Sequence, residues 1–71
     1  MEEYKNRLLI KYNSLIQELE ETDELCRKTL QDAEIKGNYS EADMALLSVF
    51  ARDNNRRLQF AKAERDLINK Y

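Results

Sequence analysis

The sequence lacks proline, tryptophan and histidine altogether, and it holds one glycine and one cysteine among 71 residues. Strands are joined by turns that rely on glycine and proline, so this composition argues against an all-β fold. Without histidine there is no imidazole base, and neither a Ser-His nor a Cys-His nucleophile can be assembled. A single glycine cannot build a phosphate-binding loop. We therefore expect no enzymatic activity and no cofactor.

Charge and hydropathy narrow the class of protein further. The formal net charge of −2 is too small to indicate a partner by itself. The longest uncharged run, residues 44–51, is far shorter than the roughly 20 apolar residues of a membrane-spanning helix. We expect a cytoplasmic protein that does not enter a membrane. The acidic stretch at residues 18–24 predicts no metal site, because its carboxylates point to more than one side of a straight helix.

Residues 2–36 carry apolar and small side chains at alternating spacings of four and three, which is typical of a helix packed along its length. Leu9, Ile16 and Leu30 lie one position further round and widen this stripe, which predicts two neighbours. Cys26 is the only cysteine, so no intrachain disulfide can form, and we expect a buried, reduced thiol. The stripe itself contains Leu8, Tyr12, Leu15, Leu19, Thr22, Cys26, Thr29 and Ala33.

One turn is predicted at residues 37–40. Gly37 can adopt the left-handed conformation that ends a helix, and Ser40 can cap the next helix. Asp43 completes a capping-box pattern in which the shorter acid replaces the usual Glu or Gln. So short a connection makes the flanking helices antiparallel neighbours. The sequence therefore predicts one all-α domain over residues 1–71, a coiled-coil-like hairpin with helices at about 2–36 and 41–70.

The second helix carries two apolar stripes about a third of a turn apart. Its mate in the hairpin covers only one of them, so the other should bind a second copy of the chain, together with Leu9 and Ile16 of the first helix. A dimer that forms a four-helix bundle is favoured, and a higher oligomer or a different protein partner stays open. The stripe assigned to the hairpin contains Leu47, Phe50, Ala51, Leu58, Ala61 and Ile68. The stripe assigned to the partner contains Leu46, Val49, Phe60, Leu67 and Tyr71.

Basic residues of the second helix suggest an alternative. Arginine and lysine interleaved with amides can contact phosphates and base edges. Folding the chain about residues 38–39 brings the acidic residues 18–24 beside 53–59, where they should neutralise part of this charge. The candidate nucleic-acid residues are Arg52, Arg56, Arg57 and Lys62.

The same folding predicts that opposite charges lie near one another across the two helices. We expect Arg57 to meet the acidic stretch, Lys11 to lie near Asp66, and Lys36 to lie near Glu41. Asn54 falls within the apolar seam and has two interpretations. It either restricts the register of the helices at some cost in stability, or it marks a weak point in the second helix.

The length, the hairpin plan and the closing residues 66–71 are faintly similar to the small helical-hairpin aspartyl-phosphate phosphatases of sporulating bacteria. Their Ser-Gln-x-Leu-Asp signature is missing here, because the corresponding stretch reads Ala61-Lys62-Ala63-Glu64-Arg65-Asp66. This similarity therefore implies neither their activity nor their site.

The leading hypothesis is a non-catalytic protein-protein interaction or adaptor protein that acts as a homo-oligomeric helical bundle. One alternative is a small nucleic-acid-binding regulator that uses the basic side of the second helix. The other is an inhibitor encoded by a mobile element that binds a host protein.

Overall fold

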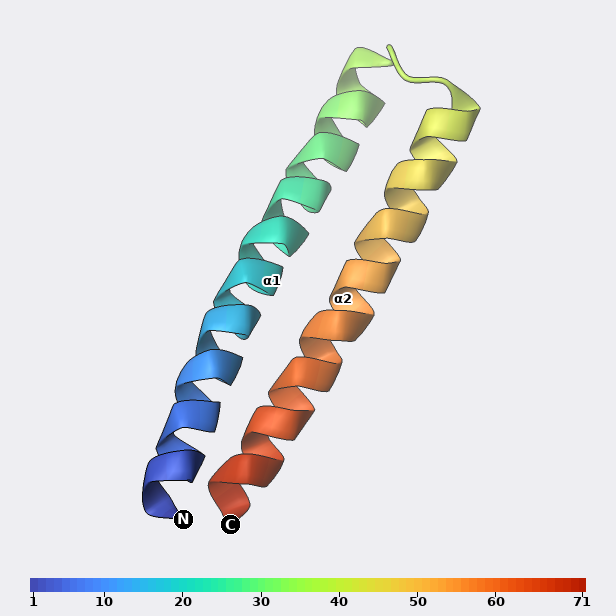
Figure 1. Ribbon diagram of the computed structural model, residues 1–71. Coiled ribbons are helices and arrows are strands. Elements are labelled where there is room, and N and C mark those ends of the chain that lie inside the picture. The colour runs from blue at the N-terminus through green and yellow to red at the C-terminus, as the bar shows by residue number, and fades with distance from the viewer.

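The computed structural model describes residues 1–71 as two α-helices joined by a short turn (Figure 1). Helix α1 spans Glu2–Lys36 and helix α2 spans Glu41–Lys70. They lie side by side and antiparallel, so the two chain ends meet at one end of the molecule and the turn closes the other. The Cα atoms extend over 53 × 14 × 13 Å. The predicted all-α antiparallel hairpin is confirmed, and neither helix has an apolar stretch that could cross a bilayer.

The turn has the local chemistry that the sequence predicts. Gly37 has φ 63°, and its N–H donates to the carbonyl oxygen of Ala33 at 2.9 Å. The Oγ of Ser40 accepts from the backbone N–H of Asp43 at 3.1 Å, and the Ser40 N–H donates to Asp43 Oδ2 at 3.4 Å. This reciprocal capping box satisfies backbone donors that have no partner within the helix. The end of α1 and the start of α2 are thus set within a few residues.

The core is a single row of side chains between the two helices. Only six of the 71 residues are buried; they are spaced by ten and seven residues along α1 and by four and three residues along α2. The central cluster joins Ile16 to Leu58 and Ala61, with Tyr12 and Leu19 packed at its edge. A core one layer deep is all that two antiparallel rods can enclose. The buried residues are Ile16, Cys26, Ala33, Asn54, Leu58 and Ala61.

Four apolar residues do not lie where the sequence pattern places them. Ile16, assigned to a partner, is buried against α2, whereas Leu15, assigned to the hairpin seam, is 44% exposed. Leu9 is half-buried one heptad before Ile16, on the same side of α1. Phe50, assigned to the hairpin, is 59% exposed. Residues one position apart differ by about 100° round a helix, so Leu15 and Ile16 cannot both face α2, and the rotation of α1 that buries Ile16 turns Leu15 toward solvent.

The expected charge matching gives no ion pair between the helices: every ion pair in the structure joins residues of one helix. Arg57 Nε lies 3.2 Å from Asp53 Oδ2, and Lys36 Nζ lies 3.3 Å from Asp32 Oδ2. Lys11 forms no ion pair with Asp66. Side chains four residues apart are already neighbours on a helix, so such pairs order less of the chain than pairs between helices.

Candidate protein-interaction face

Two apolar grooves of about 350 Å³ each run between α1 and α2. The end groove lies where the chain termini meet, and its apolar lining includes Tyr4 and Leu8 of α1 with Leu67 of α2. The middle groove includes Leu15 of α1 and Phe60 of α2. Leu8 and Leu15 are seven residues apart, and so are Phe60 and Leu67. Seven-residue steps return to the same side of a packed helix, so both grooves open on one side of the hairpin.

We define the groove face as the apolar residues on that side of both helices. Seven-residue steps from Phe60 reach Leu46 and Leu67, and the same steps from Tyr71 reach Phe50. Leu46 is 71% exposed and Phe60 68%, so large apolar side chains face solvent. Leu25 lies three seven-residue steps after Tyr4 and joins the same side of α1. The groove face comprises Tyr4, Leu8, Leu15, Leu25, Leu46, Phe50, Phe60, Leu67 and Tyr71.

The residues proposed for a partner from sequence divide into three groups in the structure. Leu46, Phe60, Leu67 and Tyr71 lie on the groove face. Val49 is also exposed, but it lies further round α2 toward solvent. Leu9 and Ile16 belong to the hairpin interior, and a partner cannot reach buried Ile16.

The other side of the hairpin has the opposite character. A groove of about 460 Å³ there is lined by polar and charged side chains with one apolar residue, Leu58. Gln17 in this lining is about 200° from Leu15 round α1, and Asn55 is about 200° from Arg57 round α2. The hairpin therefore has one apolar side and one polar side. The polar lining consists of Gln17, Glu20, Glu21, Asp23, Glu24, Arg27, Asn55, Leu58, Gln59 and Lys62.

Tyr12 and Glu64 form a polar bridge across the middle groove. The Tyr12 hydroxyl of α1 donates a hydrogen bond to Glu64 Oε2 of α2. This bond, together with lost hydration and the negative charge of Glu64, raises the pKa of the Tyr12 phenol above its ordinary value of 10.0. The sequence pattern places Tyr12 in the seam but does not predict this bond. A glutamate between two apolar stripes was the signal that could have revealed it.

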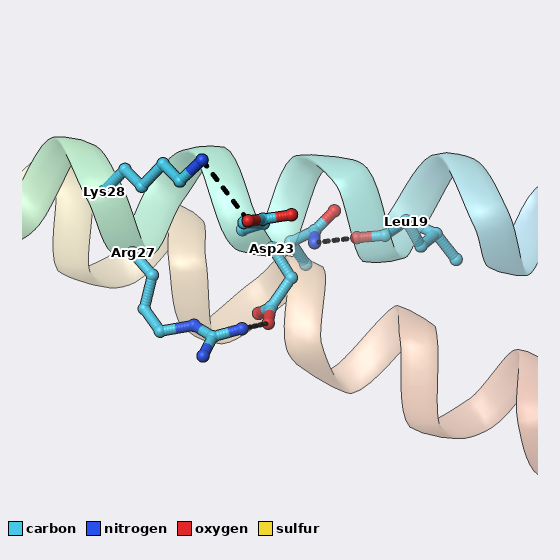
Figure 2. Close-up of polar contacts among 6 residues, drawn as sticks. Leu19, Asp23, Arg27 and Lys28 are labelled. Carbon is cyan, nitrogen blue, oxygen red and sulfur yellow. Dashed lines mark hydrogen bonds and ion pairs between the residues drawn. The ribbon is translucent and has the colours of Figure 1, made fainter.

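The contacts of Asn54 favour the first of its two interpretations, a residue that restricts the register of the helices. It is 7% exposed, and its Nδ2 donates to the carbonyl oxygen of Leu19 at 3.0 Å, the bond drawn beside Leu19 in Figure 2. Arg27 and Lys28, in the same view, pair within α1, with Asp23 and Glu24 respectively. Asn54 is thus a buried polar group with a partner on the opposite helix. It connects the two helices near their midpoints, which fixes their relative height.

The four basic residues considered for nucleic acid do not share one surface. Arg57 borders the middle groove and pairs with Asp53, whereas Lys62 borders the polar groove beside acidic residues of α1. Arg52 and Arg56 are exposed and form no ion pair.

The chain shows no converging set of metal-binding groups. No three acidic or cysteine side chains come together as ligands would, and Cys26 is buried and free. No protein-family model, curated protein or solved structure matches the chain. The apolar groove face is therefore the surface on which a functional proposal can be built.

Proposed function

We propose that this hairpin is a non-catalytic protein-interaction module that acts as a homo-oligomeric helical bundle, with the groove face as its interface. The observation that supports the proposal is that most of the large exposed apolar side chains lie on one side of the hairpin. Phe60, Leu67 and Tyr71 are all more than half exposed and lie along one side of α2. Contiguous apolar patches of this kind on a small protein mark interaction sites.

The thin core supports the same proposal. Two packed helices with only six buried residues bury little apolar surface. The free energy gained from this burial exceeds the entropic cost of ordering the whole chain by a small margin at most. Covering the groove face would supply a second packed layer. Association would therefore contribute to the stability of the fold as well as to its function.

Light scattering on charge-substituted variants tests the proposal. We expect the unmodified chain to have a mass of at least two chains at micromolar concentration. Phe60→Glu should return it to the mass of one chain, because the substitution places a charge at the centre of a desolvated interface.

Ile10→Glu is the matched control. Ile10 is 67% exposed and Phe60 is 68% exposed, so both substitutions remove an equally accessible apolar side chain. Ile10 lies seven residues before Gln17, on the side of the polar groove, and its substitution should leave the mass unchanged. A single-chain mass for the unmodified protein, or the same oligomeric mass for both variants, would contradict the proposal.

The nucleic-acid alternative makes a separate prediction. It requires salt-dependent retention on DNA or RNA through Arg52 and Arg56, reduced in the Arg52→Gln and Arg56→Gln variants. The interaction module has no polyanion site, so we expect no retention at low salt. Retention that these substitutions abolish would favour the regulator.

A further inference from the structure

Three hydrogen bonds between α1 and α2 fix which residues lie at the same height along the hairpin. Lys5 Nζ donates to the carbonyl oxygen of Asn69 at 3.5 Å, Tyr12 donates to Glu64, and Asn54 donates to Leu19 at 3.0 Å. The two residue numbers in each bond add up to nearly the same total, as expected for antiparallel helices with equal rise per residue. Each residue of α1 can therefore be matched to the residue of α2 at its height.

Most residues matched in this way across the groove face are alike in polarity or opposite in charge; the exceptions are Leu46, which lies level with Thr29, and Asp43, which lies level with Asp32. Tyr4 matches Tyr71, Leu8 matches Leu67, Leu15 matches Phe60, and Leu25 matches Phe50. Between these apolar matches, Lys11 lies level with Glu64 and Glu18 lies level with Arg57.

The two charged matches do not close within the chain. Lys11 and Glu18 form no ion pair, and Arg57 pairs with Asp53 of its own helix. Lys11, Glu64 and Arg57 all border the middle groove, beside Leu15 and Phe60. The charges are therefore placed where a molecule covering that groove would meet them.

We infer that the groove face binds a second copy of this chain about a two-fold axis parallel to the helices. Such an axis lays α1 of one copy over α2 of its partner and leaves every residue at its height. Each matched pair then forms twice between the copies, including Glu18 with the partner's Arg57 and Lys11 with the partner's Glu64. This arrangement rests on the proposed function and specifies its partner and geometry.

The reversed arrangement fits the same face poorly. A two-fold axis perpendicular to the helices lays α1 on α1 and α2 on α2, head to tail about their midpoints near Leu19 and Asn54. Glu18 then lies close to the partner's Glu18. Like charges at this height oppose association.

The size of the face agrees with a dimer of this kind. A side measuring 53 by 14 Å covers on the order of 700 Å², close to the ~800 Å² that each partner contributes to a standard interface. In the resulting four-helix bundle each helix is antiparallel to both of its neighbours, as in up-and-down bundles.

Mixing two charge-reversed variants tests the pairing. Glu18→Arg places an arginine opposite the partner's Arg57. Arg57→Glu places a glutamate opposite the partner's Glu18. Because like charges repel, each variant alone should dimerise at least about tenfold more weakly than the unmodified chain. A mixed dimer restores both pairs, so the mixture should regain nearly the original dissociation constant by analytical ultracentrifugation. Interactions within one chain cannot be restored by mixing.

Spin labels on one end of the chain test the orientation of the axis. A label at Lys70→Cys, in a Cys26→Ala background whose oligomeric mass is checked first, should give a label-to-label distance within about 30 Å, since neighbouring bundle helices lie roughly 10 Å apart. A distance near the 53 Å length of the hairpin would overturn the parallel axis.

The outcomes separate the two proposals. A dimer with widely separated labels, or one whose charge variants do not recover on mixing, overturns this arrangement and leaves the homo-oligomeric proposal intact. A single-chain mass for the unmodified protein overturns both.

Discussion

Tyr12 and Asn54 are the side chains that join the two helices by hydrogen bonds at the core. Asn54 is satisfied by the Leu19 carbonyl and Tyr12 by the Glu64 carboxylate. Buried or half-buried polar groups stabilise a fold only when they have such partners, and no fully buried side-chain nitrogen or oxygen atom here lacks one. These two bonds join the helices at single positions along a seam that is otherwise apolar.

The Tyr12 bond predicts a specific loss of stability at high pH. Its pKa is raised in the folded protein, so the bond contributes stability below the unfolded value of about 10 and loses it as pH rises through the folded pKa. We expect the melting temperature of the unmodified chain to fall more steeply above pH 10 than that of Tyr12→Phe. Thermal denaturation at a series of pH values measures the two melting temperatures. The other tyrosines and the lysines titrate in both proteins, so their effect cancels in the difference. Parallel curves for the two proteins would count against this role.

The two helices owe their bounds to local signals and their alignment to contacts between them. Gly37 ends α1, and the Ser40–Asp43 capping box starts α2. An added Cβ at Gly37 would meet no atom within 4 Å, so glycine is favoured there by its backbone conformation alone. The hydrogen bond from Asn54 to Leu19 then holds the two helices at one relative height.

Replacing Asn54 by alanine tests how much that alignment is worth. Asn54→Ala should lower the free energy of unfolding by about 1 kcal/mol relative to Asn55→Ala, the typical net value of one hydrogen bond. Asn55 is the exposed neighbour, so both substitutions gain the same helix propensity and the comparison cancels it. Chemical denaturation of both variants gives the difference. Equal unfolding free energies would show that the bond adds nothing to stability.

At the scale of the whole molecule, the hairpin is a rod with one apolar side and one polar side. Its single layer of core leaves Leu46, Phe60 and Leu67 in solvent, on the same side as two grooves. Ion pairs along each helix are mostly exposed and contribute little to stability. If the proposed association occurs, covering the groove face would bury more apolar surface and add to the stability of the fold.

Association predicts a melting temperature that depends on protein concentration. If folding and dimerisation are linked, mass action should raise the melting temperature as the total chain concentration increases. Calorimetry over a hundredfold range of concentration measures this dependence. Phe60→Glu should have a lower melting temperature that does not change with concentration. A melting temperature of the unmodified chain that does not change with concentration would show that folding does not depend on association.

The sequence alone determined the helices, the turn and the antiparallel topology. Gly37, Ser40 and Asp43 act on backbone groups within a few residues, so their effect can be predicted without knowing what lies opposite. The buried state of Cys26 and Ala33 also followed from spacing, because both lie at the centre of the seam.

Only the tertiary structure decided which side of each helix faces its mate. Ile16 lies in the core in place of Leu15, and Phe50 is exposed to solvent. Adjacent stripes differ by about 100° round a helix, so which stripe is buried depends on how the two helix surfaces pack together. The bonds from Tyr12 to Glu64 and from Asn54 to Leu19, and the gathering of both apolar grooves on one side, arise for the same reason. They depend on the rotation and height of two helices relative to each other, which no local signal fixes.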